Sequence, residues 1–238
     1  MAGGGTLVTF PTLIWIGLPS ITANATSTVA ILPGSFGAMV GYRAEMRAIH
    51  GRLYWLMVPS FIGGVAGAYL LRLTPTPVFD RLVPLLILFA TLLFMSNGVV
   101  NKRLRLGSID EKPMGLWWTG AIVFQFFSAT YGGYFGAGNG ILMLAAMGLL
   151  GLNELHRANG IKNFLGICIN AVAVLIFAGA GYVVWEDALL MACGALIGGY
   201  FGAKMAMRVG QKWVRRGIVL IGWIIFFVMV WKVRQHPQ

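Results

Sequence analysis

Long apolar segments separated by short polar connections make up most of this chain. The longer segments approach the roughly 20 residues that an α-helix needs to cross the hydrocarbon of a bilayer. They are continuous and do not alternate apolar with polar positions, so they predict helices and not strands. We therefore expect an all-α, polytopic transmembrane helical bundle with spans near these positions: 53–71, 78–97, 116–135, 164–184, 188–207 and 214–231.

One shorter apolar run stands apart from these spans. Ile141 to Leu152 is about half the length that a crossing helix requires. A glycine-rich stretch at 136–140 separates it from the preceding span. This pattern predicts a discontinuous or re-entrant helix in the second half of the chain.

The chain matches itself when it is shifted by 135 residues. At this offset Asn24 falls on Asn159, and Gly67-Ala68 falls on Gly202-Ala203. Each copy then consists of a glycine-rich element with a short apolar run, followed by three longer spans. We expect a first repeat at 1–97, a polar linker at 98–113 and a second repeat at 114–238.

Loop charges indicate how the two copies are oriented. The segment from Arg43 to Arg52 is basic, whereas the equivalent connection in the second copy carries Glu186 and Asp187. Opposite charge at equivalent loops favours an inverted repeat, because basic loops stay on the cytoplasmic side.

The composition supports a location in lipid. Of the 238 residues, 58% are hydrophobic and 11% are charged, and the mean hydropathy is +0.79. A soluble globule of this length could not bury so much apolar surface. The net charge of +11 is scattered over predicted loops, as the positive-inside rule requires, so we exclude nucleic acid as a partner.

The distribution of acidic residues narrows the chemistry. All seven lie at predicted helix ends or in loops, so no predicted span carries a carboxylate at its centre. Cation carriers and proton pumps usually keep such a group as a ligand or relay. The sequence also lacks the motifs of hydrolases, metalloproteases and nucleotide-binding proteins, and we expect no enzyme, no cofactor and no metal.

Small and uncharged polar residues recur at the same places in both copies. Glycine-rich turns expose backbone N–H groups, and the positive dipole end of a following helix suits an oxyanion. Hydroxyl and amide groups at the head of the next span could surround the anion, and one lysine could add a cation. The candidate substrate-binding residues are Gly4, Gly5, Thr6, Asn24, Thr28, Gly138, Asn139, Gly140, Asn159, Lys162 and Asn163.

Each group also has a structural interpretation. Glycines serve close helix packing, and we assign Gly63xxxGly67 and Gly198xxxGly202 to that role. The paired asparagines could cap helices, and Lys162 could extend its ammonium group to the membrane interface.

The paired motifs resemble the sulfite exporter TauE/SafE family of bacterial membrane transporters. The resemblance rests on the runs at 2–11, 17–19, 23–30, 33–34 and 41–43 in the first half, and on those at 133–140 and 158–163 in the second. It implies sulfite, a sulfonate, thiosulfate or another organic or sulfur-containing anion as substrate. The family pattern also has a helix before the first glycine-rich element, so we expect the natural protein to be longer by about one span.

The leading hypothesis is a secondary transporter in a bacterial inner membrane that moves a small anion by alternating access between its two repeats. Its partners are the anion and the lipid bilayer, and the sequence indicates no oligomeric state. The same glycine-rich breaks could instead line a passive channel for small solutes. A membrane scaffold without transport activity is the third hypothesis.

Overall fold

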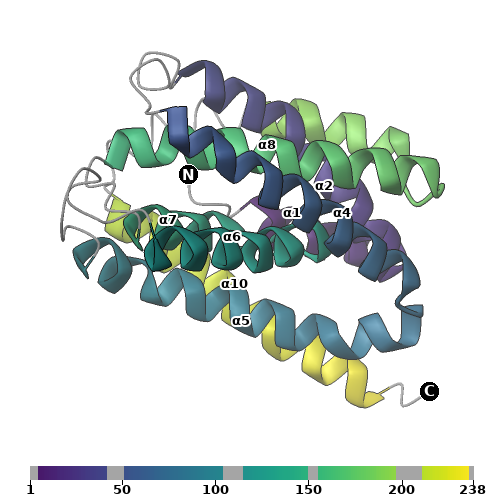
Figure 1. Cartoon of the computed structure of the whole chain (residues 1–238). Coiled ribbons are helices and arrows are strands. Elements are labelled where there is room, and N and C mark those ends of the chain that lie inside the picture. Colours follow the sequence, from purple (N-terminus) through teal and green to yellow (C-terminus); the bar gives the residue numbers. More distant parts are fainter. Residues whose placement is uncertain (1–4, 42–50, 104–114, 150–154, 197–210, 236–238) are drawn as a thin grey trace.

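The computed structural model describes residues 5–41, 51–103, 115–149, 155–196 and 211–235 (Figure 1). Every regular element within these ranges is helical, which confirms the all-α expectation. The first half contains α1 (Gly5–Trp15), α2 (Ser20–Gly41), the 3₁₀ segment η1 (Gly51–Leu56), α4 (Met57–Leu73) and α5 (Thr76–Arg103). The second half contains α6 (Leu116–Tyr134), α7 (Asn139–Leu149), α8 (Leu155–Gly179), a helix over 185–196 and α10 (Gln211–Gln235).

Three helical segments among the described residues are long and apolar enough to cross a membrane: Leu53–Leu73, Thr76–Ser96 and Ala158–Gly179. The first two agree with the predicted spans at 53–71 and 78–97. Arg216–Trp231 is a shorter apolar helix within the span predicted at 214–231. Part of the span predicted at 188–207 lies outside the described residues.

The start of the span predicted at 164–184 was wrong. Helix α8 begins at Leu155 and ends at Gly179. Its first turns contain Asn159, Lys162 and Asn163, whose polarity lowers the local hydropathy without preventing a helix. The helix ends where Gly181 adopts a positive φ of 74°, which favours glycine and closes the last turn.

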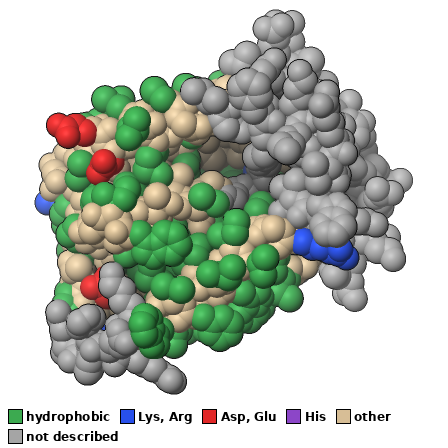
Figure 2. All heavy atoms as spheres, turned by 180° about the vertical axis from the view of Figure 1, so that it is seen from behind, with side chains coloured by type: hydrophobic (Ala, Val, Ile, Leu, Met, Phe, Trp, Pro, Cys, Tyr) green, Lys and Arg blue, Asp and Glu red, His purple; other side chains and the backbone are tan. Residues whose placement is uncertain are grey.

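The surface of the bundle is largely apolar. Leu73, Leu175 and Leu190 are each more than 70% exposed. Figure 2 shows apolar side chains spread over the described part of one face, with acidic side chains gathered toward one end. Apolar side chains on this scale are expected to face lipid.

Two pairs of long helices run antiparallel in the bundle. Helix α5 lies beside α10, and α2 lies beside α8 (Figure 1). The backbone N–H of Val184, just past the end of α8, donates to the hydroxyl of Thr26 near the start of α2, at 3.1 Å. The beginning of α2 therefore lies at the end of α8.

Helices α4 and α6 cross with their backbones in contact, because glycine occupies the contact positions. A Cβ atom on Gly63 would lie 2.7 Å from the Cβ of Ala129, and one on Gly67 would lie 2.8 Å from the backbone nitrogen of Tyr134. A Cβ on Gly133 would collide with the carbonyl oxygen of Gly64. The packing role predicted for Gly63xxxGly67 is confirmed, whereas Gly198xxxGly202 lies outside the described residues.

The buried apolar side chains form two clusters. The first surrounds Phe10, Phe79 and Phe135 and joins α1, α2, α5, α10 and the end of α8. The second surrounds Met143 and Leu165 and joins α6, α7 and the start of α8. The segment between α6 and α7 lies in the first cluster, through Phe135 and Ala137, although both helices contribute residues to the second.

Candidate functional site

The predicted helix break is present between α6 and α7, at 135–138. Gly136 and Gly138 have positive φ values of 78° and 75°, a conformation that residues with a Cβ rarely adopt. The hydroxyl of Tyr131 donates to the carbonyl oxygen of Ala137 at 2.6 Å and holds the turn against α6. Helix α7 has 11 residues and is about 16 Å long, so it cannot cross a bilayer alone.

The backbone of the break is less available to a ligand than the sequence suggested. The N–H of Asn139 donates to the carbonyl oxygen of Gly136 at 3.2 Å, and the N–H of Ile141 donates to that of Gly138 at 2.9 Å. The amides of Asn139 and Ile141 are therefore occupied in this conformation. A ligand that used these two groups would have to replace their bonds.

Of the predicted residues in the first half, Asn24 is the one that bonds to the break. Its Nδ2 donates to the carbonyl oxygen of Tyr134, the last residue of α6, at 2.9 Å. The phenyl ring of Phe10 packs edge-on against Phe135, with ring centroids 5.3 Å apart. The structure thus brings α1 and α2 of the first half against the break of the second half.

Asn24 keeps one unused hydrogen-bonding group. The residue is 1% exposed, and its Oδ1 has no hydrogen-bond partner among the described residues. One turn earlier, the buried hydroxyl of Ser20 also lacks a described partner. Buried polar atoms are nearly always paired with protein, water or ligand, so these two atoms are candidates for a bond to water or to a ligand.

The other predicted residues of the first half occupy different positions. Thr6 is buried in α1, and the Thr28 hydroxyl donates to the backbone oxygen of Asn24 at 2.8 Å. Gly5 is exposed at the start of α1, and Gly4 lies outside the described residues. Thr28 is consequently engaged with its own helix and holds the polar segment in place.

In the second half, Asn139 is turned toward α6. It is 7% exposed, and its Oδ1 accepts a hydrogen bond from the Ser128 hydroxyl at 2.8 Å. Its Nδ2 lies where a Cβ on Gly132 would be. Gly140 is half-buried beside it. Asn139 therefore joins the break to α6 at Ser128, an earlier position on that helix than Tyr134, which Asn24 contacts.

The remaining predicted residues lie away from Asn24. Lys162 is 4% exposed among residues of the second cluster, and Asn159 and Asn163 are half-buried nearby on α8. Because α2 and α8 are antiparallel, the polar head of each helix lies toward the opposite end of the pair. The structure does not gather all the predicted residues around one ligand position.

Sequence reasoning missed three contributors to this polar interior: Ser20, Ser128 and the backbone oxygen of Tyr134. Ser20 could have been found from its spacing of one helical turn before Asn24. The others depend on contacts between helices that no local pattern records.

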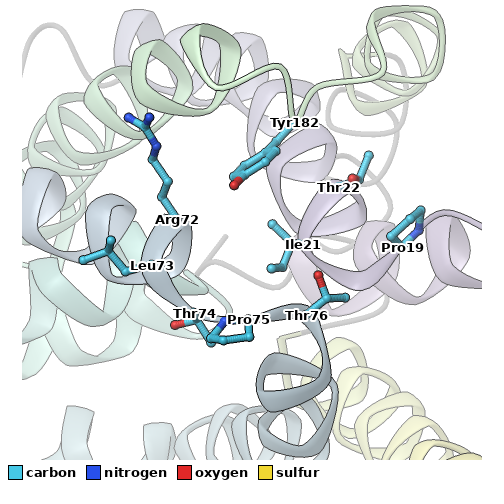
Figure 3. Close-up of a pocket in the computed structure, with 9 residues that line it drawn as sticks. All are labelled: Pro19, Ile21, Thr22, Arg72, Leu73, Thr74, Pro75, Thr76 and Tyr182. Atoms are coloured by element: carbon cyan, nitrogen blue, oxygen red, sulfur yellow. The ribbon is translucent and has the colours of Figure 1, made fainter. Parts of the chain in front are cut away.

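A cavity of about 290 Å³ lies at the end of the bundle where α2 begins and α4 ends (Figure 3). None of the predicted site residues lines it. Thr74 on its wall lies 3.3 Å from the hydroxyl of Tyr134, hydroxyl oxygen to hydroxyl oxygen. Tyr134 therefore touches the cavity wall with its side chain and Asn24 with its backbone.

Acidic groups among the described residues stay at the ends of helices. Asp80 and Glu186 are exposed, and Asp187 is half-buried. No group of three His, Cys, Asp or Glu within the described ranges could hold a metal ion. The other acidic residues, Glu45, Asp110, Glu111 and Glu154, lie outside those ranges.

Comparison with known proteins gives a family. The family model described as "Sulfite exporter TauE/SafE" matches residues 1–229. A "Probable membrane transporter protein" of Haemophilus influenzae is 29% identical over 97% of this chain and 88% of its own length. "Probable membrane transporter protein YfcA" of Escherichia coli K12 is 27% identical over 93% of this chain and 80% of its own. "Probable membrane transporter protein ORF9" of a Sinorhizobium species is 27% identical over 93% and 82%. No solved structure matches the chain.

Proposed function

The chain belongs to the sulfite exporter TauE/SafE family and is a multi-pass membrane transporter, not an enzyme. From this premise we propose that it is a secondary transporter of a small sulfur-containing or organic anion of the sulfite or sulfonate type. The anion passes between the two halves of the bundle by alternating access. We place the protein in a bacterial inner membrane, because the relatives are bacterial and its spans are apolar helices.

The observation that carries this proposal is the contact of Asn24 with the helix break. A residue of α2 bonds the last carbonyl of α6, next to two glycines with positive φ. Irregular backbone at membrane depth is tolerated where it is enclosed by protein or lines a path. Two buried polar atoms without described partners lie on α2 at this point. We assign the central substrate position to this region.

The predicted residues that lie elsewhere fit a path better than a single closed site. Asn24 lies toward one end of the α2–α8 pair, Asn139 lies at the break, and Lys162 lies toward the other end. A carrier that alternates its access needs polar groups on both sides of its central site. Lys162 would then bind the anion on the second side of the break and not together with Asn24.

The positions of the helices support an inverted repeat, which remains part of the proposal. Helices α2 and α8 begin 135 residues apart, at Ser20 and Leu155, and α5 and α10 begin 135 residues apart, at Thr76 and Gln211. Each pair runs antiparallel. The short helices show the same relation: α1 of the first half contacts α10 of the second, and α7 of the second half contacts α5 of the first. These relations are expected of two copies related by an axis in the membrane plane.

The first test is binding to the purified protein. We expect sulfite, thiosulfate, sulfoacetate or a small carboxylate to raise the Tm, because a ligand at 100 times its Kd adds about 2.7 kcal/mol to the free energy of unfolding. The substitution Asn24→Leu should abolish this shift. Gln125→Leu is the matched control, because it makes the same amide-to-aliphatic change at a buried position on the α4–α6 crossing. No shift with any anion, or an unchanged shift in Asn24→Leu, contradicts the proposal.

A further inference from the structure

The cavity beside α2 has an electrostatic character that the central site lacks. Its nine lining residues include one charged side chain, Arg72, and no acidic one. Thr22, Thr76 and Tyr182 add hydroxyl groups to its wall. In Figure 3 the Arg72 side chain points away from Thr74 and Thr76, and Tyr182 lies across from it. An arginine and hydroxyl groups that line the same cavity are suited to an oxyanion.

Arg72 is available for such a ligand. Its side chain is exposed, and within the described residues it has no carboxylate partner. The acidic residues at this end of the bundle, Asp80, Glu186 and Asp187, do not line the cavity. Among the described residues that line the cavity, Arg72 therefore carries the only charge.

The wall of the cavity adjoins residues of the central region. Ile21 and Thr22 of its wall directly follow Ser20 on α2, whose buried hydroxyl lacks a described partner. On the other wall, Thr74 contacts the hydroxyl of Tyr134, and the backbone oxygen of Tyr134 accepts from Asn24. Two elements of the cavity wall are thus continuous with the residues around the break.

The distribution of charge places this cavity on one side of the membrane. Helices α2 and α5 begin at the cavity end, and α10 runs antiparallel to α5, so the ends of α2 and α5 and the start of α10 lie at the other end. Basic residues dominate the sequence around these three helix ends, at 42–52, 102–112 and 204–216. The positive-inside rule makes that end cytoplasmic, so the cavity faces outward.

We propose that this cavity is an outer anion-binding vestibule, in which Arg72 attracts a small oxyanion and passes it to or from the site at Asn24. This inference rests on the proposed function, because the vestibule would supply the transport path. The binding of an anion in the cavity can still be tested without transport.

The test uses a thiol placed inside the cavity. In a background with Cys168→Ala and Cys193→Ala, Thr22→Cys is treated in right-side-out vesicles with two membrane-impermeant methanethiosulfonates, one anionic (sulfonatoethyl) and one cationic (trimethylammonioethyl). Arg72 should favour the anionic reagent. Arg72→Gln should lower the ratio of the anionic to the cationic rate about 10-fold, since a focused charge changes encounter rates by at least that factor. Arg72→Lys should largely retain the ratio.

The matched control is Arg81→Gln. Arg81 is exposed on the first turns of α5, at the same end of the bundle and outside the cavity lining. It should change the ratio less than about 2-fold, because water and salt screen a charge outside the cavity. Equal effects of Arg72→Gln and Arg81→Gln, or labelling only from the cytoplasmic side, would overturn the vestibule.

Protection by an unreactive anion provides the second readout. Methanesulfonate should slow labelling of the Thr22→Cys thiol with Arg72 present and should leave it unchanged in the Arg72→Gln variant. Lack of protection in both proteins counts against the vestibule. If protection occurs while the purified protein transports no anion, the proposed function fails and the vestibule stands. If transport occurs without Arg72-dependent protection, the vestibule fails and the proposed function stands.

Discussion

Helix α6 takes part in two contacts of opposite character. Along Phe126 to Tyr134 it crosses α4, where Gly63 and Gly67 bring the backbones together and no room is left for a side chain. At its end it meets Asn24 and turns into the break, where polar atoms are buried without described partners. The crossing is closely packed, and we propose that the break accepts the ligand. On this proposal, the glycines of the crossing hold the fold, whereas those of the break serve transport.

The largest effect on stability should come from the crossing. Gly67→Ala places a Cβ against the carbonyl oxygen of Thr130, which cannot move without its helix. We expect a loss of about 3 kcal/mol in the free energy of unfolding, at the upper end for overpacked interiors. Thermal unfolding in detergent measures it. Gly166→Ala on α8 is the control, because nothing lies within 4 Å of its new Cβ, and a normal Tm for Gly67→Ala would contradict the rigid crossing.

The next effect should come from the left-handed turn of the break. Gly138→Ala forces a Cβ into a φ of 75° and should cost about 1 to 2 kcal/mol. Gly181→Ala has the same backbone problem at a φ of 74° after α8, with nothing within 4 Å of the new Cβ. Both variants should show a similar fall in Tm. Only Gly138→Ala should also lose the anion-dependent rise in Tm, and an unchanged rise there would separate the break from binding.

A smaller change is expected where the two regions of α6 meet. A Cβ on Gly132 would displace the amide of Asn139, the flexible end of a side chain, and would break its bond with Ser128. Gly132→Ala should therefore cost about 1 kcal/mol, the usual net value of one hydrogen bond. We expect a clear loss of transport with only a small fall in Tm. Loss of folded protein would instead place Gly132 in the rigid crossing.

The smallest effect should come from Gln125. Its Nε2 donates to the Ser60 hydroxyl at 2.8 Å, while its buried Oε1 has no described partner. Ser60 also donates to the carbonyl oxygen of Leu56, so the hydroxyl proton of Ser60 keeps its acceptor when Gln125 is replaced. Gln125→Leu should change the free energy of unfolding by less than about 1 kcal/mol. A large destabilisation, measured by thermal unfolding, would show that the amide supports the crossing.

Much of the fold follows from local patterns in the sequence. Continuous apolar runs of sufficient length located α4 and α5, and the cluster of glycines at 136–140 located the break. Helix α5 continues to Arg103, into the segment 98–113 that we assigned to a linker, because polar residues after Asn97 still form helical turns. Hydropathy measures affinity for lipid, so it does not detect the part of a helix that extends beyond the lipid.

The candidate site was less predictable, because it depends on how helices meet. The polarity of Asn24 and Asn139 marked them as candidates, and both are buried at the break. Their partners, Tyr134 and Ser128, could not be inferred from spacing, since a carbonyl group gives no sequence signal and the hydroxyl is one of many. Lys162 lies apart from Asn24 because antiparallel packing of α2 and α8 places the starts of the two helices at opposite ends of the pair.

The most direct test of the central claim is anion flux in proteoliposomes that contain the anion selected by the binding assay. We expect saturable uptake that is accelerated by the same anion on the other side. Asn24→Leu should reduce this uptake at least about 10-fold, the effect of losing one specific polar contact worth 1.4 kcal/mol or more. Asn159→Leu and Gly138→Val should impair it as well, whereas Gln125→Leu should not. Unsaturated flux without exchange, or full flux in Asn24→Leu, Asn159→Leu and Gly138→Val, would contradict a carrier with its site at the helix break.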